Sequence, residues 1–143
     1  TDEATLDDLL EVRLGLECNS AMLAAQRATD TDIRAIRKSL EEMIEDLRET
    51  DKIGTAADAA FHMAVTFATK NPVFIYLMRN FYDFLFLGIK KNLTHMYMDR
   101  AALEDVIAHH RAVFDAIERR NPQAAYDAMH THIRCVQEYF RSR

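Results

Sequence analysis

The sequence predicts an all-α protein, built as an antiparallel bundle of about six to seven helices in one domain. Three observations lead to this fold class. The 143 residues include only three glycines and two prolines, too few for the many turns of a β-sandwich or barrel. Apolar residues recur at spacings of three and four, the period of an amphipathic helix. Residues that cap helices recur between these stretches, and such short joints between long helices favour antiparallel neighbours around one core.

The first half of the chain contains three predicted helices. The first runs from about Leu6 to Arg27 and is followed by Thr29–Asp32, whose side-chain oxygens can cap the next helix. The second, from Asp32 to Glu49, has alternating charges typical of a solvated helix face. Gly54-Thr55 is interpreted as a C-terminal stop followed by a new cap, and the third helix follows from Ala56 to Thr69.

The second half of the chain contains three more predicted helices. Asn71-Pro72 and Asn121-Pro122 each supply an N-cap followed by proline at the first helical position. These signals predict helices from Val73 to His95 and from Gln123 to Arg141. Between them, the spacing of apolar residues predicts a helix from Arg100 to Arg120.

Composition excludes several classes of protein. The formal net charge of −5 excludes binding to nucleic acid by bulk charge, since this requires a basic face. Cys18 and Cys135 are too few for a disulfide framework or a zinc ribbon, so we expect buried, reduced thiols in a cytoplasmic protein. The longest apolar stretch, Phe81 to Ile89, is interrupted by Asp83 and by Gly88, where the helix could break. We therefore expect no membrane span.

The N-terminal end of the sequence gives two further expectations. The acidic start Thr1–Glu3 is unlike a signal peptide, which begins with basic residues. The chain lacks an initiator methionine, so we expect a trimmed fragment with a segment missing upstream.

Titratable residues interrupt the apolar faces of three predicted helices. Asp58 and His62 lie four residues apart on one face of the third, so their side chains lie one above the other. His110 and His132 lie on the apolar faces of the last two helices, whereas His109 is rotated away by about 100°. His130 lies off the apolar face of the last helix. The apolar neighbours that define the three faces are Phe61, Val65 and Ala68 in the third helix, Leu103, Val106, Val113 and Ile117 in the fifth, and Ala125, Met129, Val136 and Tyr139 or Phe140 in the last.

One aspartate and three neutral imidazoles are suitable ligands for a divalent transition metal, with zinc, nickel, manganese and iron as candidates. An ion with five or six coordination positions would keep one or two open for a small anion. The alternative is that these histidines are ordinary core residues and that the Asp-x-x-x-His pair is a surface hydrogen bond. A carboxylate that faces a core is costly unless it is paired or bound to a metal.

Arg13 interrupts the leucines of the first helix. It can clamp a carboxylate through two parallel hydrogen bonds, or it can extend to solvent or to a neighbouring acid. Lys90, Lys91 and Asn92 can contact an anion or face solvent. No phosphate-binding loop, nucleophile elbow or acid–base pair is evident, and nothing distinguishes Glu17 among the many acidic residues.

The whole chain resembles the C-terminal ligand-sensing domain, of the FCD type, found in the FadR subfamily of GntR transcription regulators. The residues that carry the resemblance are Leu9 to Arg13, Asp58 to His62, Asn71-Pro72, His110 to Ile117 and Ala124 to His132. Within the family the chain looks most like the lactate- and pyruvate-responsive branch, through Phe81 to Phe84 and Lys90 to Tyr97.

The resemblance implies a helical bundle that holds a divalent ion with Asp58, His62, His110 and His132, with zinc the metal expected in purified protein. It implies a small hydroxy- or keto-carboxylate effector, such as lactate or pyruvate, and assigns Arg13 to the ligand pocket. We add Asn92 as an effector contact. The resemblance further implies a cytoplasmic homodimer that binds DNA only through an N-terminal winged helix absent from this chain. A metal-dependent enzyme acting on a small acid and a purely structural helical module are the alternatives.

Overall fold

Six helices make up the described part of the chain. The computed structural model describes residues 3–51 and 53–142, and no strand occurs among them. The helices are α1 (Glu3–Arg27), α2 (Asp30–Thr50), α3 (Thr55–Phe67), α4 (Pro72–Met96), α5 (Arg100–Glu118) and α6 (Pro122–Arg141). The predicted all-α bundle is confirmed, and each helix lies close to its predicted range.

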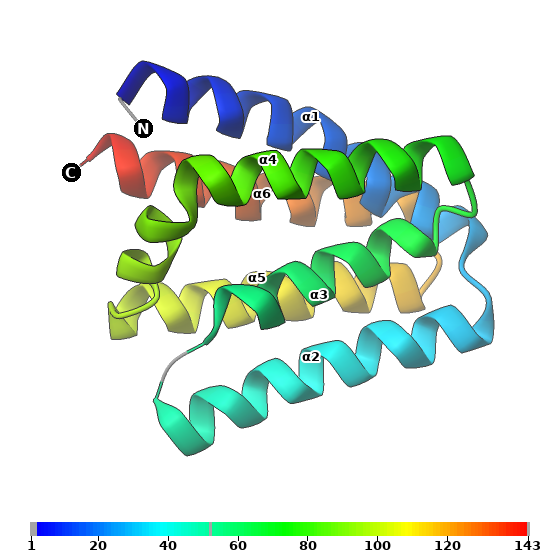
Figure 1. Cartoon of the computed structure of the whole chain (residues 1–143). Coiled ribbons are helices and arrows are strands. Elements are labelled where there is room, and N and C mark those ends of the chain that lie inside the picture. The colour runs from blue at the N-terminus through cyan, green and yellow to red at the C-terminus, as the bar shows by residue number, and fades with distance from the viewer. Residues whose placement is uncertain (1–2, 52, 143) are drawn as a thin grey trace.

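The helices share one core, as the short joints predict. α1 packs mainly against α6, α6 also packs against α5, and α2 packs against α3 (Figure 1). The two ends of the chain lie together at one end of the bundle, where Arg141 Nε is 3.0 Å from Asp7 Oδ1. Every helix contributes fully buried side chains to the core, among them Leu10, Ile36, Phe61, Leu85, Val113 and Ile133.

Most of the predicted helix starts are confirmed by their capping contacts. Thr29 and Asp32 form a capping box, in which each side chain accepts a hydrogen bond from the other residue's backbone N–H. Asn71 accepts hydrogen bonds from the first turn of α4, and Asn121 accepts one from Ala124. Of these three helices, α6 carries one of the predicted metal ligands, His132.

The prediction for Gly54-Thr55 was wrong in detail. α2 ends at Asp51, which adopts the left-handed conformation with a φ of 62° and donates its backbone N–H to Leu47 O. Gly54 is the N-cap of α3, with a φ of −74°, and Thr55 is the first helical residue. Aspartate tolerates the left-handed region better than most residues, so no glycine was needed to end α2.

Helix α4 does not break at the position where the sequence allowed a break. It continues from Pro72 to Met96 without a break at Gly88, although Figure 1 shows its last turns bending away from the earlier ones. It is also long and apolar enough to cross a membrane by length and composition alone, the one such helix in the described residues. The expectation of no membrane span, which rested on Asp83 and Gly88 interrupting the apolar stretch, stays a prediction. The side of α4 that carries Met78, Tyr82 and Leu85 is buried in the bundle.

Candidate metal centre

The four predicted metal ligands lie together in the middle of the bundle. α3 supplies Asp58 and His62 from successive turns, α5 supplies His110 and α6 supplies His132. One potential ligand atom from each lies within 4.8 Å of the others, and none of the four residues is more than 3% exposed. Helices from three parts of the sequence therefore bring one carboxylate and three imidazoles to a single point.

The separations of the donor atoms are compatible with one bound ion. Asp58 Oδ1 lies 2.9 Å from His110 Nε2 and 3.3 Å from His62 Nε2. At the usual zinc–ligand distance of about 2.0–2.1 Å, neighbouring ligand atoms are separated by roughly 3–3.4 Å. These two separations already match that spacing, and a small inward movement would bring in the more distant donors.

Two of the histidines are oriented by contacts on the ring nitrogen that points away from the cluster. His110 Nδ1 lies 2.6 Å from Val106 O and donates to it, while Nε2 faces Asp58 Oδ1 at 2.9 Å. His62 Nδ1 lies 2.8 Å from Glu17 Oε2. Carbonyl and carboxylate partners of this kind are typical behind metal-ligating histidines, because they fix the ring orientation and the tautomer.

His132 gives the strongest indication that something is bound. Its side chain is 1% exposed, yet neither ring nitrogen has a hydrogen-bond partner in the described structure. Burial, with His110 and His62 close by, keeps the pKa of His132 well below its usual value, so the ring is neutral. A buried neutral imidazole with no partner is costly in a structural core and suitable as a ligand. The residues present therefore fit a divalent cation.

Arg13 lies beside the cluster with much of its hydrogen-bonding capacity unused. It is 1% exposed, and its Nε donates to Glu17 Oε2 at 3.2 Å. Its Nη2 is 3.9 Å from Asp58 Oδ2, and neither Nη1 nor Nη2 makes a hydrogen bond. Burial alone would lower the pKa of the guanidinium, but Tyr82, Glu17 and Asp58 raise it, so the group keeps its charge. A charged, underused guanidinium of this kind suits a carboxylate ligand.

The sequence analysis missed three residues that surround the donors. Glu17 is fully buried and contacts both Arg13 and His62, and Tyr82 donates its hydroxyl hydrogen to Glu17 Oε2. Tyr97 donates to Asp58 Oδ2 at 2.7 Å. One signal was available for Glu17, because it follows Arg13 by four residues on the same helix face.

The charges in the cluster are tightly linked. Burial would raise the pKa of the Asp58 carboxyl, but His62 and His110 hold it well below its ordinary value. Burial would likewise lower the pKa of His62, but Glu17 and Asp58 together raise it to about 9. Without a metal ion, the ring of His62 is therefore protonated at neutral pH, and an ion that binds there replaces the proton.

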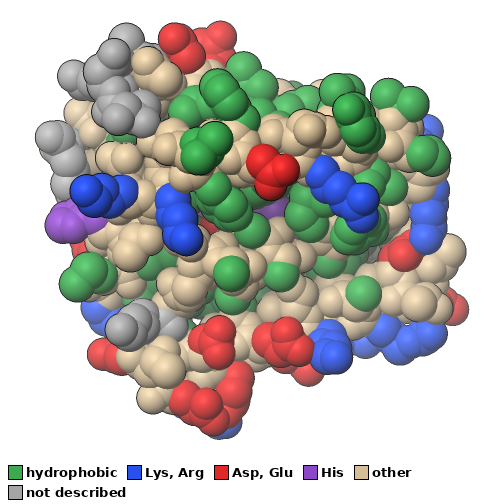
Figure 2. Space-filling model, viewed as in Figure 1, with side chains coloured by type: hydrophobic (Ala, Val, Ile, Leu, Met, Phe, Trp, Pro, Cys, Tyr) green, Lys and Arg blue, Asp and Glu red, His purple; other side chains and the backbone are tan. Residues whose placement is uncertain are grey.

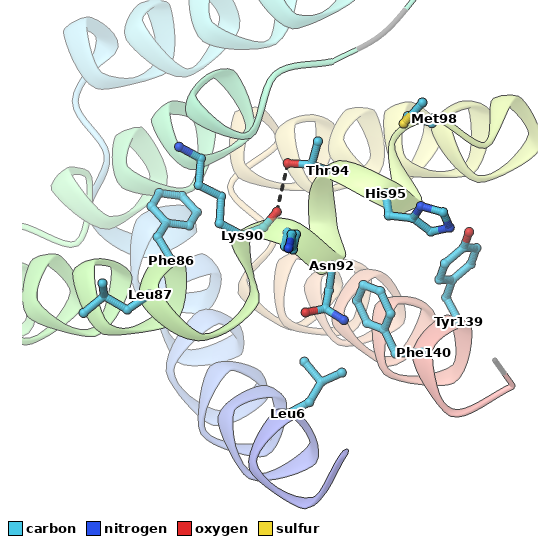
Figure 3. A pocket seen from close by; sticks show the side chains of 11 residues that line it. Leu6, Phe86, Leu87, Lys90, Asn92, Thr94, His95, Met98, Tyr139 and Phe140 are labelled. Atoms are coloured by element: carbon cyan, nitrogen blue, oxygen red, sulfur yellow. Dashed lines mark hydrogen bonds between the residues drawn. The ribbon is translucent and has the colours of Figure 1, made fainter. Parts of the chain in front are cut away.

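The remaining predicted contacts lie elsewhere. Asn92 lines an open groove of about 980 Å³ together with Lys90, Lys91 and His95. None of the four donors lines this groove, and neither does Arg13. Figure 3 shows its walls, which come from α4 and from the ends of α1 and α6. The role of Asn92 as an effector contact stays a prediction, and the structure gives it a site separate from the donor cluster.

Relatives among known proteins share the family that the sequence resembles. Over 129 residues the chain is 34% identical to the "Putative L-lactate dehydrogenase operon regulatory protein" of Escherichia coli K12, which covers 90% of this chain and 49% of the relative. Over 142 residues it is 31% identical to the "Glc operon transcriptional activator" of the same organism, covering 96% of this chain and 56% of the relative. The chain thus spans about half the length of these two relatives.

Solved structures agree with the sequence comparison. Streptococcus agalactiae GntR superposes with a TM-score of 0.79 at 28% identity, covering 97% of this chain and 61% of that one. E. coli McbR/YncC superposes with a TM-score of 0.76 at 16% identity, a likeness of fold alone. The sequence profile of the FCD domain matches residues 8–134, nearly the full length of the chain. This protein therefore belongs to the FCD domain family.

Proposed function

We propose that the chain is the effector-binding domain of a bacterial transcription regulator and that it senses a small carboxylate through a divalent metal ion. Asp58, His62, His110 and His132 would hold the ion. The observation that carries the proposal is the convergence of these four buried donors while both ring nitrogens of His132 are without partners. Zinc is the metal expected in purified protein, with nickel, manganese and iron as alternatives.

The ion would supply a fixed positive charge and open coordination positions for oxygen ligands. The chain supplies everything else. Glu17 and the carbonyl of Val106 orient two of the imidazoles. Arg13 is placed to pair with the effector's carboxylate through the terminal nitrogens that make no hydrogen bond within the described structure. Because the site is fully buried, these charge interactions are strong and poorly screened by salt.

The effector class follows from this chemistry and from the relatives. A small acid with an oxygen next to its carboxylate offers one group to Arg13 and another to the ion. The relatives named above regulate a lactate dehydrogenase operon and a Glc operon, according to their names. We therefore propose a hydroxy- or keto-carboxylate such as lactate, glycolate or pyruvate. Since these relatives are regulators, we propose that the site binds its ligand without converting it.

Binding would act on the arrangement of the helices. The donors come from α3, α5 and α6 and the guanidinium comes from α1, so a ligand that contacts both sides favours one packing of these helices. It can shift that equilibrium only by its difference in affinity for the two arrangements. In the intact regulator, which we propose to be a cytoplasmic homodimer, this shift would reposition the winged-helix domains that bind DNA.

Calorimetric titration tests the proposal. L-lactate, glycolate and pyruvate are titrated separately into the zinc-loaded chain, into the His110→Ala variant and into the His130→Ala variant. We expect at least one acid to bind with one site per chain, to lose its binding in the His110 variant and to keep it in the variant of the exposed His130. Equal binding to all three proteins, or to none, would contradict the proposal.

A further inference from the structure

Helix α4 has an apolar stripe on the side that faces away from the bundle. Val73, Leu77, Phe84 and Leu87 are 67%, 51%, 61% and 88% exposed. With Asn80 between them they follow spacings of four, three, four and three, so they form one line along the helix. The opposite side of the helix is buried, through Met78, Tyr82, Leu85 and Ile89. A helix that is apolar on two sides normally has both of them covered.

The stripe is large enough for an interface. Together with Tyr76, which is 67% exposed, these side chains present roughly 600 Å², if a fully exposed aromatic side chain contributes about 200 Å². Two such surfaces would together bury about 1,200 Å², the lower limit of a specific protein interface. Figure 2 shows green side chains gathered along α4, with acidic and basic groups among them.

The stripe is self-complementary under a two-fold rotation. Asn80 lies at its middle, and a polar residue in such a seam is a common way to fix the register of two helices. Val73 and Tyr76 protrude at one end of α4, while the groove that begins at Leu87 lies at the other, about 20 Å away by helical rise. A rotation about an axis near Asn80 places the protruding end of each copy over the groove of the other.

A second copy explains these features better than a membrane does. α4 has the length and composition of a membrane span, but its buried side is part of the core and cannot leave the bundle. The exposed charges of Arg79 and Asp83 lie beside the middle of the stripe, where a hydrocarbon environment would penalise them. A lipid surface also offers no reason for a groove at one end and protruding side chains at the other.

We propose that two copies of this chain associate through the stripe on α4, antiparallel to each other, with the two-fold axis near Asn80. The inference rests on the homodimer in the proposed function and identifies its surface. It does not depend on the metal centre, because no donor residue lies on the stripe.

Light scattering after gel filtration tests the surface at micromolar protein concentrations. We expect the chain, of 16.5 kDa, to elute with twice that mass. Leu87→Glu and Phe84→Glu should each weaken association about tenfold or more, since each places a charge within the apolar interface. Val12→Glu is the matched control, because Val12 is 51% exposed on α1, and it should leave the dimer intact. Circular dichroism of each variant should show the same helix content.

A cross-link tests the register. An Asn80→Cys variant, made in a Cys135→Ser background because Cys135 is only half-buried, should form an intermolecular disulfide on oxidation. A dimer that resists both glutamate variants, or that fails to cross-link through position 80, would overturn the proposed surface and leave the homodimer standing. A monomeric chain would overturn both the proposed surface and the homodimer. The calorimetric test of the metal site would be unaffected. A monomer that binds lipid vesicles through Leu87 would assign the stripe to a membrane.

Discussion

Replacing His132 with leucine should stabilise the metal-free protein. The histidine is fully buried and both of its ring nitrogens are without partners. A buried polar group of this kind costs about 1–3 kcal/mol, and leucine has a similar volume and no polar atom to satisfy. We expect the free energy of unfolding to rise by about 1–2 kcal/mol, which for a chain of this length raises Tm by about 3–6 °C.

Bound zinc should make the wild type more stable than the His132→Leu variant, which reverses their order in the metal-free state. At a free zinc concentration of about 100 times Kd, a ligand that binds only the folded state adds about 2.7 kcal/mol. The wild type should gain this amount and the variant, which lacks one donor, much less. Thermal unfolding with a chelator and then with excess zinc measures both effects. His130→Leu is the control, because this exposed histidine lies two residues earlier on α6 and its loss should change either value by less than about 0.5 kcal/mol.

The opposite pattern would refute the reasoning. If His132→Leu lowers Tm in the chelator, the ring is an ordinary core group whose packing matters more than its unpaired nitrogens. If zinc fails to raise the Tm of the wild type, the donors do not form a site.

The same contacts predict the effects of two further substitutions and of pH on stability and zinc affinity. Glu17→Gln leaves Arg13 buried without its closest carboxylate, so the free energy of unfolding should fall by about 3–5 kcal/mol in urea titrations. It should also weaken zinc binding by about 10–100-fold, since it removes the partner of His62, and unchanged affinity would contradict this role. Tyr97→Phe removes the hydrogen bond to Asp58 and should cost about 1.5–3 kcal/mol in the same assay; a smaller loss would show that the bond is unimportant. Because the pKa of His62 is raised from 6.5 to about 9 on folding, its contribution to the stability of metal-free protein is complete below pH 6.5 and is lost as the pH rises through about 9. The affinity for zinc, measured against a competing chelator, should fall as the pH falls from about 9, because protons then compete with the metal ion for His62. An affinity that does not depend on pH would contradict the displacement of a proton from this ring.

Local signals in the sequence were sufficient to predict where most of the helices lie. The caps at Thr29, Asn71 and Asn121 act within three residues, so their effect could be predicted without tertiary structure. The end of α2 could not be predicted in this way, because it depends on Asp51 adopting the left-handed conformation rather than on the nearby Gly54. Glycine is the commonest residue there but is not required.

The donor cluster was predictable for a similar reason. A helix face is set by its period, so an aspartate or histidine that interrupts an apolar face must point inward. Which inward groups meet is a matter of packing between helices, and the residues around the donors depend on it. Glu17 and Tyr82 come from α1 and α4, 65 residues apart, and no spacing within one helix relates them. The exposed stripe on α4 was missed because apolar residues all round a helix look like core in a sequence.

A crystal of the chain soaked in nickel or zinc, with diffraction recorded at the absorption edge of the metal, tests the central claim most directly. We predict one anomalous peak per chain, within about 2.0–2.2 Å of a donor atom from each of Asp58, His62, His110 and His132. An absent peak, or one found only at exposed side chains such as His95 or His130, would contradict the account.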